Sequence, residues 1–241
     1  KVTKQYKLDH GKWKTGKKHI YYYDSTKKKV TGLVKIGKRK YYFDKKGIQW
    51  TGWRKYKGNY YYFRTYNGKK GYMVTGKKVN GIKLTKSGKA KLGSDILTKK
   101  VRIMAECSKL VNENTYATMK KKKKLKTMFE YVKKNYSYTG GSFSKAEHWE
   151  IDYAWQMVRY GNGTCYHFGG MFAFFANAVG YNTAYAVSSG GHGWAEVEGC
   201  VCDPTQQMAD KKHSYFLMPM ELSGVNGRPR YSRNRVYIKK I

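Results

Sequence analysis

The first part of the chain repeats a short aromatic unit. The dipeptide Thr-Gly recurs at 31–32, 51–52 and 75–76, and an aromatic run precedes each occurrence: IYYYD (20–24), KYYFD (40–44) and NYYYF (59–63). Each run lies between polar turns rich in Gly and Lys, which is typical of short β-hairpins. A single hairpin is barely stable in water, so these units must stack on one another through their aromatic rings. The repeat therefore predicts an all-β solenoid of hairpins.

Basic charge is concentrated in the same part of the chain. Residues 1–100 contain thirty Lys and Arg against four Asp and Glu, whereas residues 101–241 contain twenty against eleven. Such a field attracts polyanions: nucleic acid, an anionic membrane surface, or the phosphate-rich polymers of a bacterial wall. The 24 Tyr, interleaved with Lys, exclude a disordered basic tail.

No membrane span is predicted, because no apolar run approaches the roughly 20 residues that cross a bilayer. The chain begins at Lys1 instead of Met, which fits a removed signal peptide and a trimmed chain equally well. These observations allow a secreted protein, but charge alone does not choose among the three classes of polyanion.

The repeat resembles the cell-wall-binding, or choline-binding, repeats of Gram-positive surface proteins, in which Gly-Trp, Trp-Tyr-Tyr and Thr-Gly recur around turns. The similarity covers about residues 11–93. In that family Trp faces hold a quaternary ammonium by cation–π attraction, but here only Gly52 and Trp53 keep the Gly-Trp pair. The resemblance implies binding to an anionic wall polymer, such as teichoic acid or a similar glycan, with choline as an alternative ligand.

Six aromatic residues of the repeats are candidates for ligand contact: Trp13, Tyr21, Tyr41, Trp50, Trp53 and Tyr60. The alternative for each ring is that it fills the interior of the solenoid. The last unit, residues 77–90, lacks aromatic residues and is expected to cap the array.

From about Asp95 the apolar residues change to helical spacing. Two sets fit one face of a helix each: Leu97, Val101, Met104 and Val111, then Leu125, Met128, Phe129 and Val132. A further helix is expected to begin at Cys165, because residues 161–164 form a loop with a good cap residue and Gly180 ends the apolar pattern. Residues 1–93 and 94–241 are therefore expected to be two domains.

Cys165 falls in the first turn of this helix, where the helix dipole and unpaired amide groups favour a thiolate, the reactive form of cysteine. His167 lies about 200° further around the helix and points away from the thiol. The base must come from elsewhere in the chain. Of the other cysteines, Cys107 is expected to be a buried core thiol, and four cysteines in a chain of this length do not indicate a disulfide framework.

His192 and Asp203 are candidates for the base and the group that orients it. Residues 183–189 and 192–196 are predicted strands, and the turn at 197–199 brings the next strand back antiparallel. Asp203 then lies directly opposite His192 or diagonal to it, within reach of the imidazole. Individually, these residues are ordinary, but together with Cys165 they predict an acyl-transfer site that requires no metal and no cofactor.

Three motifs resemble the transglutaminase-like superfamily: Gly-x-Cys at a helix start, His-x-Trp-x-Glu-Val on a strand, and Asp-Pro-Thr. The similarity covers about residues 95–241. It implies an α+β fold with a papain-like core, in which the helix that bears the cysteine packs on an antiparallel sheet. It also implies a catalytic triad of Cys165, His192 and Asp203 that acts through a thioester.

The oxyanion of such a reaction needs two donors. The amide of Cys165 would supply one, and the candidates for a second, side-chain donor are Trp149, Trp155 and Gln156. Each of these side chains could equally belong to the core.

The sequence therefore predicts a secreted or surface-attached bacterial cysteine peptidase or amidase, held at the wall by its repeats and acting on a protein or peptide. A cross-linking transglutaminase is the alternative among enzymes. A non-catalytic surface-binding or adhesion protein is the alternative from another class. Nucleic-acid binding is the weakest hypothesis, because the aromatic residues recur with the period of a hairpin.

Overall fold

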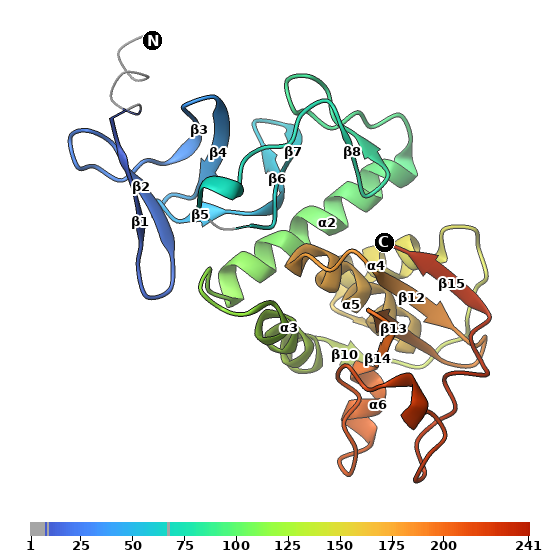
Figure 1. Ribbon diagram of the computed structural model, residues 1–241. Helices are drawn as coiled ribbons and strands as arrows, with labels where there is room; N and C mark the ends of the chain where they lie inside the picture. The colour runs from blue at the N-terminus through green and yellow to red at the C-terminus, as the bar shows by residue number, and fades with distance from the viewer. Residues whose placement is uncertain (1–7, 9, 67) are drawn as a thin grey trace. The chain divides into compact units, whose positions relative to one another are not determined.

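The computed structural model describes residues 8, 10–66 and 68–241 (Figure 1). It consists of two compact units: Lys1–Gly93 with Ser108–Lys120, and Ser94–Cys107 with Lys121–Ile241. Helix α2 (Asp95–Asn114) therefore contributes residues to both units. None of the helices in the described part of the chain is long and apolar enough to cross a membrane.

The first unit is a series of antiparallel hairpins, as predicted. Its elements are β1 (Lys12–Thr15), β2 (Ile20–Tyr23), β3 (Gly32–Ile36), β4 (Arg39–Phe43), β5 (Gln49–Trp50), β6 (Gly52–Tyr56), β7 (Asn59–Phe63), η1 (Gly68–Lys70), β8 (Lys78–Val79) and β9 (Ile82–Lys83). Strand β1 pairs with β2, β3 with β4, β6 with β7, and β8 with β9, while β5 adds a third strand beside β4.

Tight turns and stacked rings explain why these residues form hairpins. Lys57 and Gly58, which join β6 to β7, both have positive φ (45° and 77°), the conformation of a two-residue turn that matches strand twist. Rings of different hairpins then share clusters: Tyr22 of β2 packs with Tyr41 and Phe43 of β4. Each hairpin therefore supplies apolar surface that a neighbouring hairpin buries.

Residues 108–120 belong to the first unit through direct hydrogen bonds. The amide of Trp53 donates to the Ser108 hydroxyl at 2.9 Å, and the amide of Thr51 donates to Asn112 Oδ1 at 3.2 Å. Both donors lie at the Thr-Gly repeat between β5 and β6, so this part of α2 satisfies backbone groups of the hairpins.

The second unit combines helices with a four-stranded antiparallel sheet of order β14-β13-β12-β15 (Figure 1). After the first residues of α2, its elements are α3 (Lys121–Asn135), β10 (Ser137–Tyr138), α4 (Trp149–Tyr160), β11 (Asn162–Gly163), α5 (Cys165–Val179), β12 (Ala184–Ser188), β13 (Gly193–Val197), β14 (Cys200–Cys202), α6 (Pro204–Ala209), η2 (Met220–Leu222) and β15 (Tyr237–Lys240). The predicted helices and strands are confirmed, with boundaries shifted by a residue or two.

Helix α5 packs closely on β12 and β13 because the facing residues are small. Ala186 and Ala195 form a cross-strand pair. A Cβ added to Gly169 would lie 2.7 Å from the backbone carbonyl atoms of Trp194. Close packing therefore explains why residue 169 is a glycine. The close contact between helix and sheet offsets the poor helix propensity of this residue.

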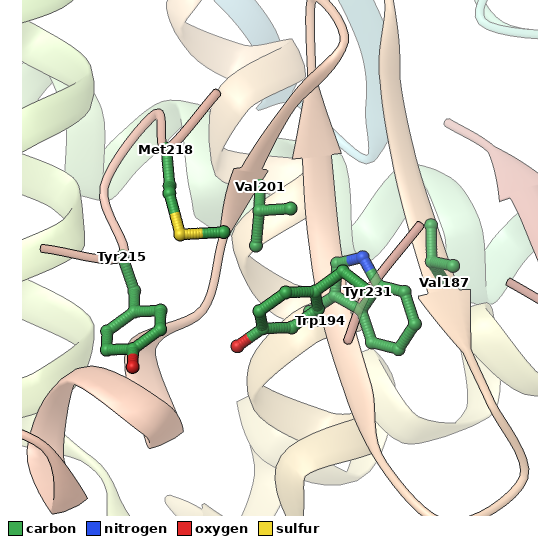
Figure 2. Packing of buried hydrophobic residues seen from close by; sticks show 6 residues of the cluster. All are labelled: Val187, Trp194, Val201, Tyr215, Met218 and Tyr231. Carbon is green, nitrogen blue, oxygen red and sulfur yellow. The ribbon is translucent and has the colours of Figure 1, made fainter. Parts of the chain in front are cut away.

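The opposite face of the sheet carries a buried aromatic cluster, shown in Figure 2. Its members are Val187, Trp194, Val201, Tyr215, Met218 and Tyr231. The Trp194 and Tyr231 rings meet edge to face with centroids 5.0 Å apart. This cluster attaches the irregular segment after α6 to the sheet, and that segment carries Tyr215 and Tyr231.

We expect Gly169→Ala to lower the free energy of unfolding by about 1–3 kcal/mol, because the added methyl meets backbone that cannot move aside. Gly170→Ala is the matched control: its methyl would lie 3.3 Å from the Glu150 carbonyl oxygen, and the gain of about 1 kcal/mol in helix propensity offsets this tighter contact. Urea unfolding measures both variants. Equal midpoints would contradict the close approach of helix and sheet.

Candidate active site

Cys165 is the first residue of α5 and is 5% exposed. The loop before it is held by His167, whose Nδ1 accepts the amide N–H of Thr164 at 3.0 Å, while its Nε2 lies 2.8 Å from Gln156 Oε1. Burial lowers the pKa of His167 to about 4, so this imidazole is neutral. His167 therefore holds the start of the helix through Thr164 and Gln156, a role that the sequence did not predict.

His192 and Asp203 meet across adjacent strands. The register pairs Ala195 with Cys202, so Asp203 continues opposite Trp194 and lies diagonal to His192. This is one of the two arrangements expected from the sequence. His192 Nε2 lies 2.5 Å from Asp203 Oδ2, which leaves Nδ1 as the ring nitrogen available to Cys165.

Asp203 is fully buried, and four donors surround it. Its Oδ2 accepts from His192 and from the Tyr231 hydroxyl at 2.8 Å, and its Oδ1 accepts from the Thr205 hydroxyl at 2.8 Å and the Gln206 amide at 2.9 Å. Burial alone would raise the pKa of Asp203, but the charge of His192 and these hydrogen bonds outweigh it and lower the pKa. The carboxylate also caps the N-terminus of α6.

The imidazole of His192 is held in its charged form. Burial lowers the pKa of His192, but attraction and hydrogen bonding from Asp203, followed by the hydrogen bond and charge of Cys165, raise it to about 10. A positively charged ring beside the thiol stabilises a thiolate. The three side chains therefore form one coupled electrostatic system.

An ion pair between buried Glu196 and exposed Arg235 orients the aromatic ring beside His192. The Trp194 and His192 rings are nearly parallel, with centroids 6.1 Å apart. Trp194 Nε1 donates to Glu196 Oε1 at 3.1 Å, and Arg235 contacts both oxygens of Glu196 at 2.8 Å. The bidentate geometry of this pair makes the support rigid, so Trp194 limits how far the imidazole can turn.

Tyr138 contacts Cys165, and sequence analysis did not identify it. Burial raises the pKa of the Tyr138 hydroxyl, and so do the charge of Cys165 and a hydrogen bond with the Cys165 thiol. The backbone amide of Cys165 also hydrogen-bonds to the Tyr138 oxygen. Tyr138 and His192 border a cavity of about 530 Å³ whose other lining residues are Thr205, Gln206, Met208 and Ala209. This cavity has no acidic, lysine or arginine side chain in its lining.

Comparison with known protein families agrees with this geometry. Residues 108–207 match the transglutaminase-like superfamily, and residues 30–70 match the choline-binding repeat. The chain carries choline-binding repeats followed by a transglutaminase-like domain. The repeats indicate association with the cell wall, and the domain indicates a cysteine-type enzyme.

Solved structures with partial similarity to the chain include choline-binding proteins. Choline-binding protein F from Streptococcus pneumoniae, solved with a peptidoglycan analogue, is 26% identical over 33% of this chain and 26% of its own, with a TM-score of 0.30. The pneumococcal cell wall endolysin from phage Cp-1, solved with choline, is 30% identical over 34% of this chain and 25% of its own, also with a TM-score of 0.30. The chain thus spans about a quarter of each. No curated protein matches the chain.

The three candidates for a second oxyanion donor have other defined contacts, and their role as donors stays a prediction. Trp149 is buried against Phe143, and Gln156 is bound to His167. Trp155 is half-buried, with the guanidinium of Arg102 5.8 Å from its ring. Tyr138 had no sequence signal beyond its place between a helix and a Gly-Gly loop.

The remaining cysteines of the transglutaminase-like domain are free thiols, as is Cys165. Cys107 is fully buried, and its Sγ lies 3.9 Å from the Met171 sulfur, as expected of a core thiol. Burial raises the pKa of both Cys107 and Cys202. These two thiols are therefore poor nucleophiles.

In the choline-binding repeats, the six candidate aromatic residues are distributed over different hairpins. Tyr41, Trp50, Trp53 and Tyr60 are buried, and Trp13 and Tyr21 are half-buried. Two of them have defined polar partners: Tyr41 donates to the Lys69 carbonyl at 2.9 Å, and Trp53 donates to Asn80 Oδ1 at 3.1 Å. Ligand contact by these residues stays a prediction, while packing explains their burial.

Proposed function

We propose that this protein is a secreted, wall-attached cysteine peptidase or amidase with a papain-like core. Residues 1–93 would form the wall-binding domain and residues 94–241 the catalytic domain. The observation that carries the proposal is the coupling of Cys165, His192 and Asp203, with His192 at the border of a cavity. A peptide or protein is the substrate class, because the cavity beside the acyl-transfer site is lined, apart from His192, by uncharged side chains.

In the proposed reaction, the Cys165 thiolate attacks an amide carbonyl carbon and forms a C–S bond. The electron pair of the carbonyl moves to its oxygen, and the Cys165 amide and the Tyr138 hydroxyl are the two donors close enough to stabilise that charge. His192 then gives its proton to the departing amine as the C–N bond breaks. Water, deprotonated by His192, hydrolyses the thioester and releases Cys165.

Incubation with wall peptides, and separately with casein plus an amine donor, tests this proposal by mass spectrometry. We expect cleavage or deamidation by the native protein and none by Cys165→Ala. Incorporation of the amine without hydrolysis would make cross-linking the function instead. No product from either substrate, with an unreactive Cys165, would favour a non-catalytic surface protein.

Tyr138→Phe refines the same experiment, because it removes one hydroxyl and keeps the ring. We expect kcat to fall about 10- to 100-fold with little change in KM, since an oxyanion donor acts mainly in the transition state. An unchanged kcat would exclude Tyr138 from that role.

A further inference from the structure

Arginine side chains of the first unit lie on the aromatic faces of the repeats. The Arg54 guanidinium is 4.0 Å from the centroid of the Trp50 ring and 4.8 Å from that of Tyr42. Arg39 lies 3.9 Å from the Tyr72 ring. The face of an aromatic ring attracts a cation. In this protein, arginine side chains of the same chain already occupy these faces.

Arg54 is held by rings and not by a carboxylate. Its Nη2 donates to the Tyr42 hydroxyl at 3.3 Å, and its buried Nε has no hydrogen-bond partner. Trp50 and Tyr42 are 5% and 8% exposed, which leaves little ring surface for a second cation. A quaternary ammonium such as choline could therefore reach these two faces only if Arg54 moved away.

Positive charge also gathers around Tyr72. Arg64 Nη1 lies 2.7 Å from the Tyr72 hydroxyl, and the pKa of Tyr72 is lowered, first by this hydrogen bond and then by the charges of Arg64, Arg39 and Lys77. A cavity of about 350 Å³ opens here, and its lining is Arg64, Tyr72, Met73, Val74, Thr75 and Lys77. Among the described residues, the lining contains two cations and a threonine but no carboxylate.

Acidic side chains do not compensate this charge. Residues 1–93 contain 28 Lys and Arg but only three Asp and Glu. The two acids in the described part of this range accept backbone amides within turns: Asp24 from Thr26 and Lys28, and Asp44 from Lys46 and Ile48. The cavity beside Tyr72 is therefore suited to a ligand that brings its own negative charge.

We propose that this cavity binds the phosphate groups of a phosphodiester-linked wall polymer, and that Arg54 closes the Trp50 and Tyr42 faces to choline. A guanidinium matches phosphate oxygens in pairs, and an ammonium and a hydroxyl add further donors. The choice of a wall polymer rests on the proposed wall attachment, while the sign of the ligand's charge rests on the cavity. The acyl-transfer site plays no part in this inference.

Binding of the full chain to purified poly(glycerol phosphate) teichoic acid tests the cavity at about 0.15 M salt. We expect the double variant Arg64→Gln/Lys77→Gln to bind at least tenfold more weakly. The control Lys35→Gln/Lys86→Gln removes the same charge from two exposed positions outside the cavity and should lose less than threefold. Equal losses would overturn the proposal in favour of a diffuse basic field, and tighter binding to single-stranded DNA would overturn the polymer assignment.

Calorimetry with choline chloride tests the role of Arg54. The native chain should bind no choline at millimolar concentration, whereas Arg54→Ala should gain binding and the neighbouring control Lys55→Ala should not. Choline binding by the native chain contradicts the proposal even if Arg54→Ala does not fold.

Walls stripped of phosphate polymer distinguish failure of this proposal from failure of the proposed wall attachment. If the chain still binds stripped walls, the polymer is not the ligand, but wall attachment stands. If the chain does not bind intact walls, wall attachment itself is refuted.

Discussion

Cys165 is expected to react with iodoacetamide at pH 7 at least tenfold faster in the native protein than in His192→Ala. An unassisted thiol is only a few per cent thiolate at this pH, whereas a positively charged imidazole beside a thiol favours the reactive form, and His192 hydrogen-bonds to Cys165. Peptide mapping of the alkylated protein measures each cysteine separately. Half-buried Cys200 provides an internal comparison in the same chain.

The pH dependence of this reaction follows from His192. Its folded pKa is about 10, above the ordinary 6.5, so the fold holds the positive charge through neutral pH and loses it as the pH rises through about 10. The advantage over His192→Ala should therefore persist at pH 7 and vanish above pH 10, where an ordinary thiol is also ionised. Equal alkylation rates at pH 7 would refute the coupled pair.

Asp203→Asn is expected to lower acyl transfer by about 10³- to 10⁴-fold, the range found when a triad carboxylate becomes an amide. The Thr205 hydroxyl and the Gln206 amide keep an oxygen at the Oδ1 position, so the new NH₂ group faces His192. His192 Nε2 must then accept a hydrogen bond, which places the proton on Nδ1, toward the thiol. An imidazole in this tautomer cannot accept a proton from that side.

Asp203→Ala should in addition destabilise the protein by about 3–5 kcal/mol, because it leaves a buried cation and three other donors without an acceptor. The matched control is Tyr231→Phe, which removes one of the four donors and should cost about 1 kcal/mol. Thermal and urea unfolding measure both variants. If Asp203→Ala were as stable as Tyr231→Phe, or Asp203→Asn kept native activity, the carboxylate would have neither role.

Local sequence patterns were enough to predict the elements that carry the triad. The helix start at Cys165 follows from a loop, a cap residue and apolar residues at helical spacing, all within about 20 positions. The meeting of His192 with Asp203 follows from a short turn at Glu198 and Gly199, both of which have positive φ. Because pairing across such a turn is nearly fixed by its length, the sequence limits Asp203 to one of two positions beside His192.

Other contacts of the site connect positions that no short-range pattern relates. Tyr231 reaches Asp203 across 28 residues, and Arg235 reaches Glu196 across 39. Both side chains lie in or near irregular chain, where neither a helical nor a strand period marks an inward position. Tyr138 is placed by the parallel pairing of β10 with β11, another contact that a local pattern does not predict.

By itself, the sequence determined the hairpin repeats, the helix at Cys165 and the three residue types of the triad, because each follows from periodicity, turn chemistry or reactivity over short stretches of chain. Only the tertiary structure decided which rings of the repeats are covered, and by what. Arg54 lies on Trp50 and Tyr42 because folding brings three strands together, and side-chain packing between strands depends on register and rotamer as well as on residue order. The same packing places Tyr138 beside Cys165 and the Tyr231 hydroxyl on Asp203.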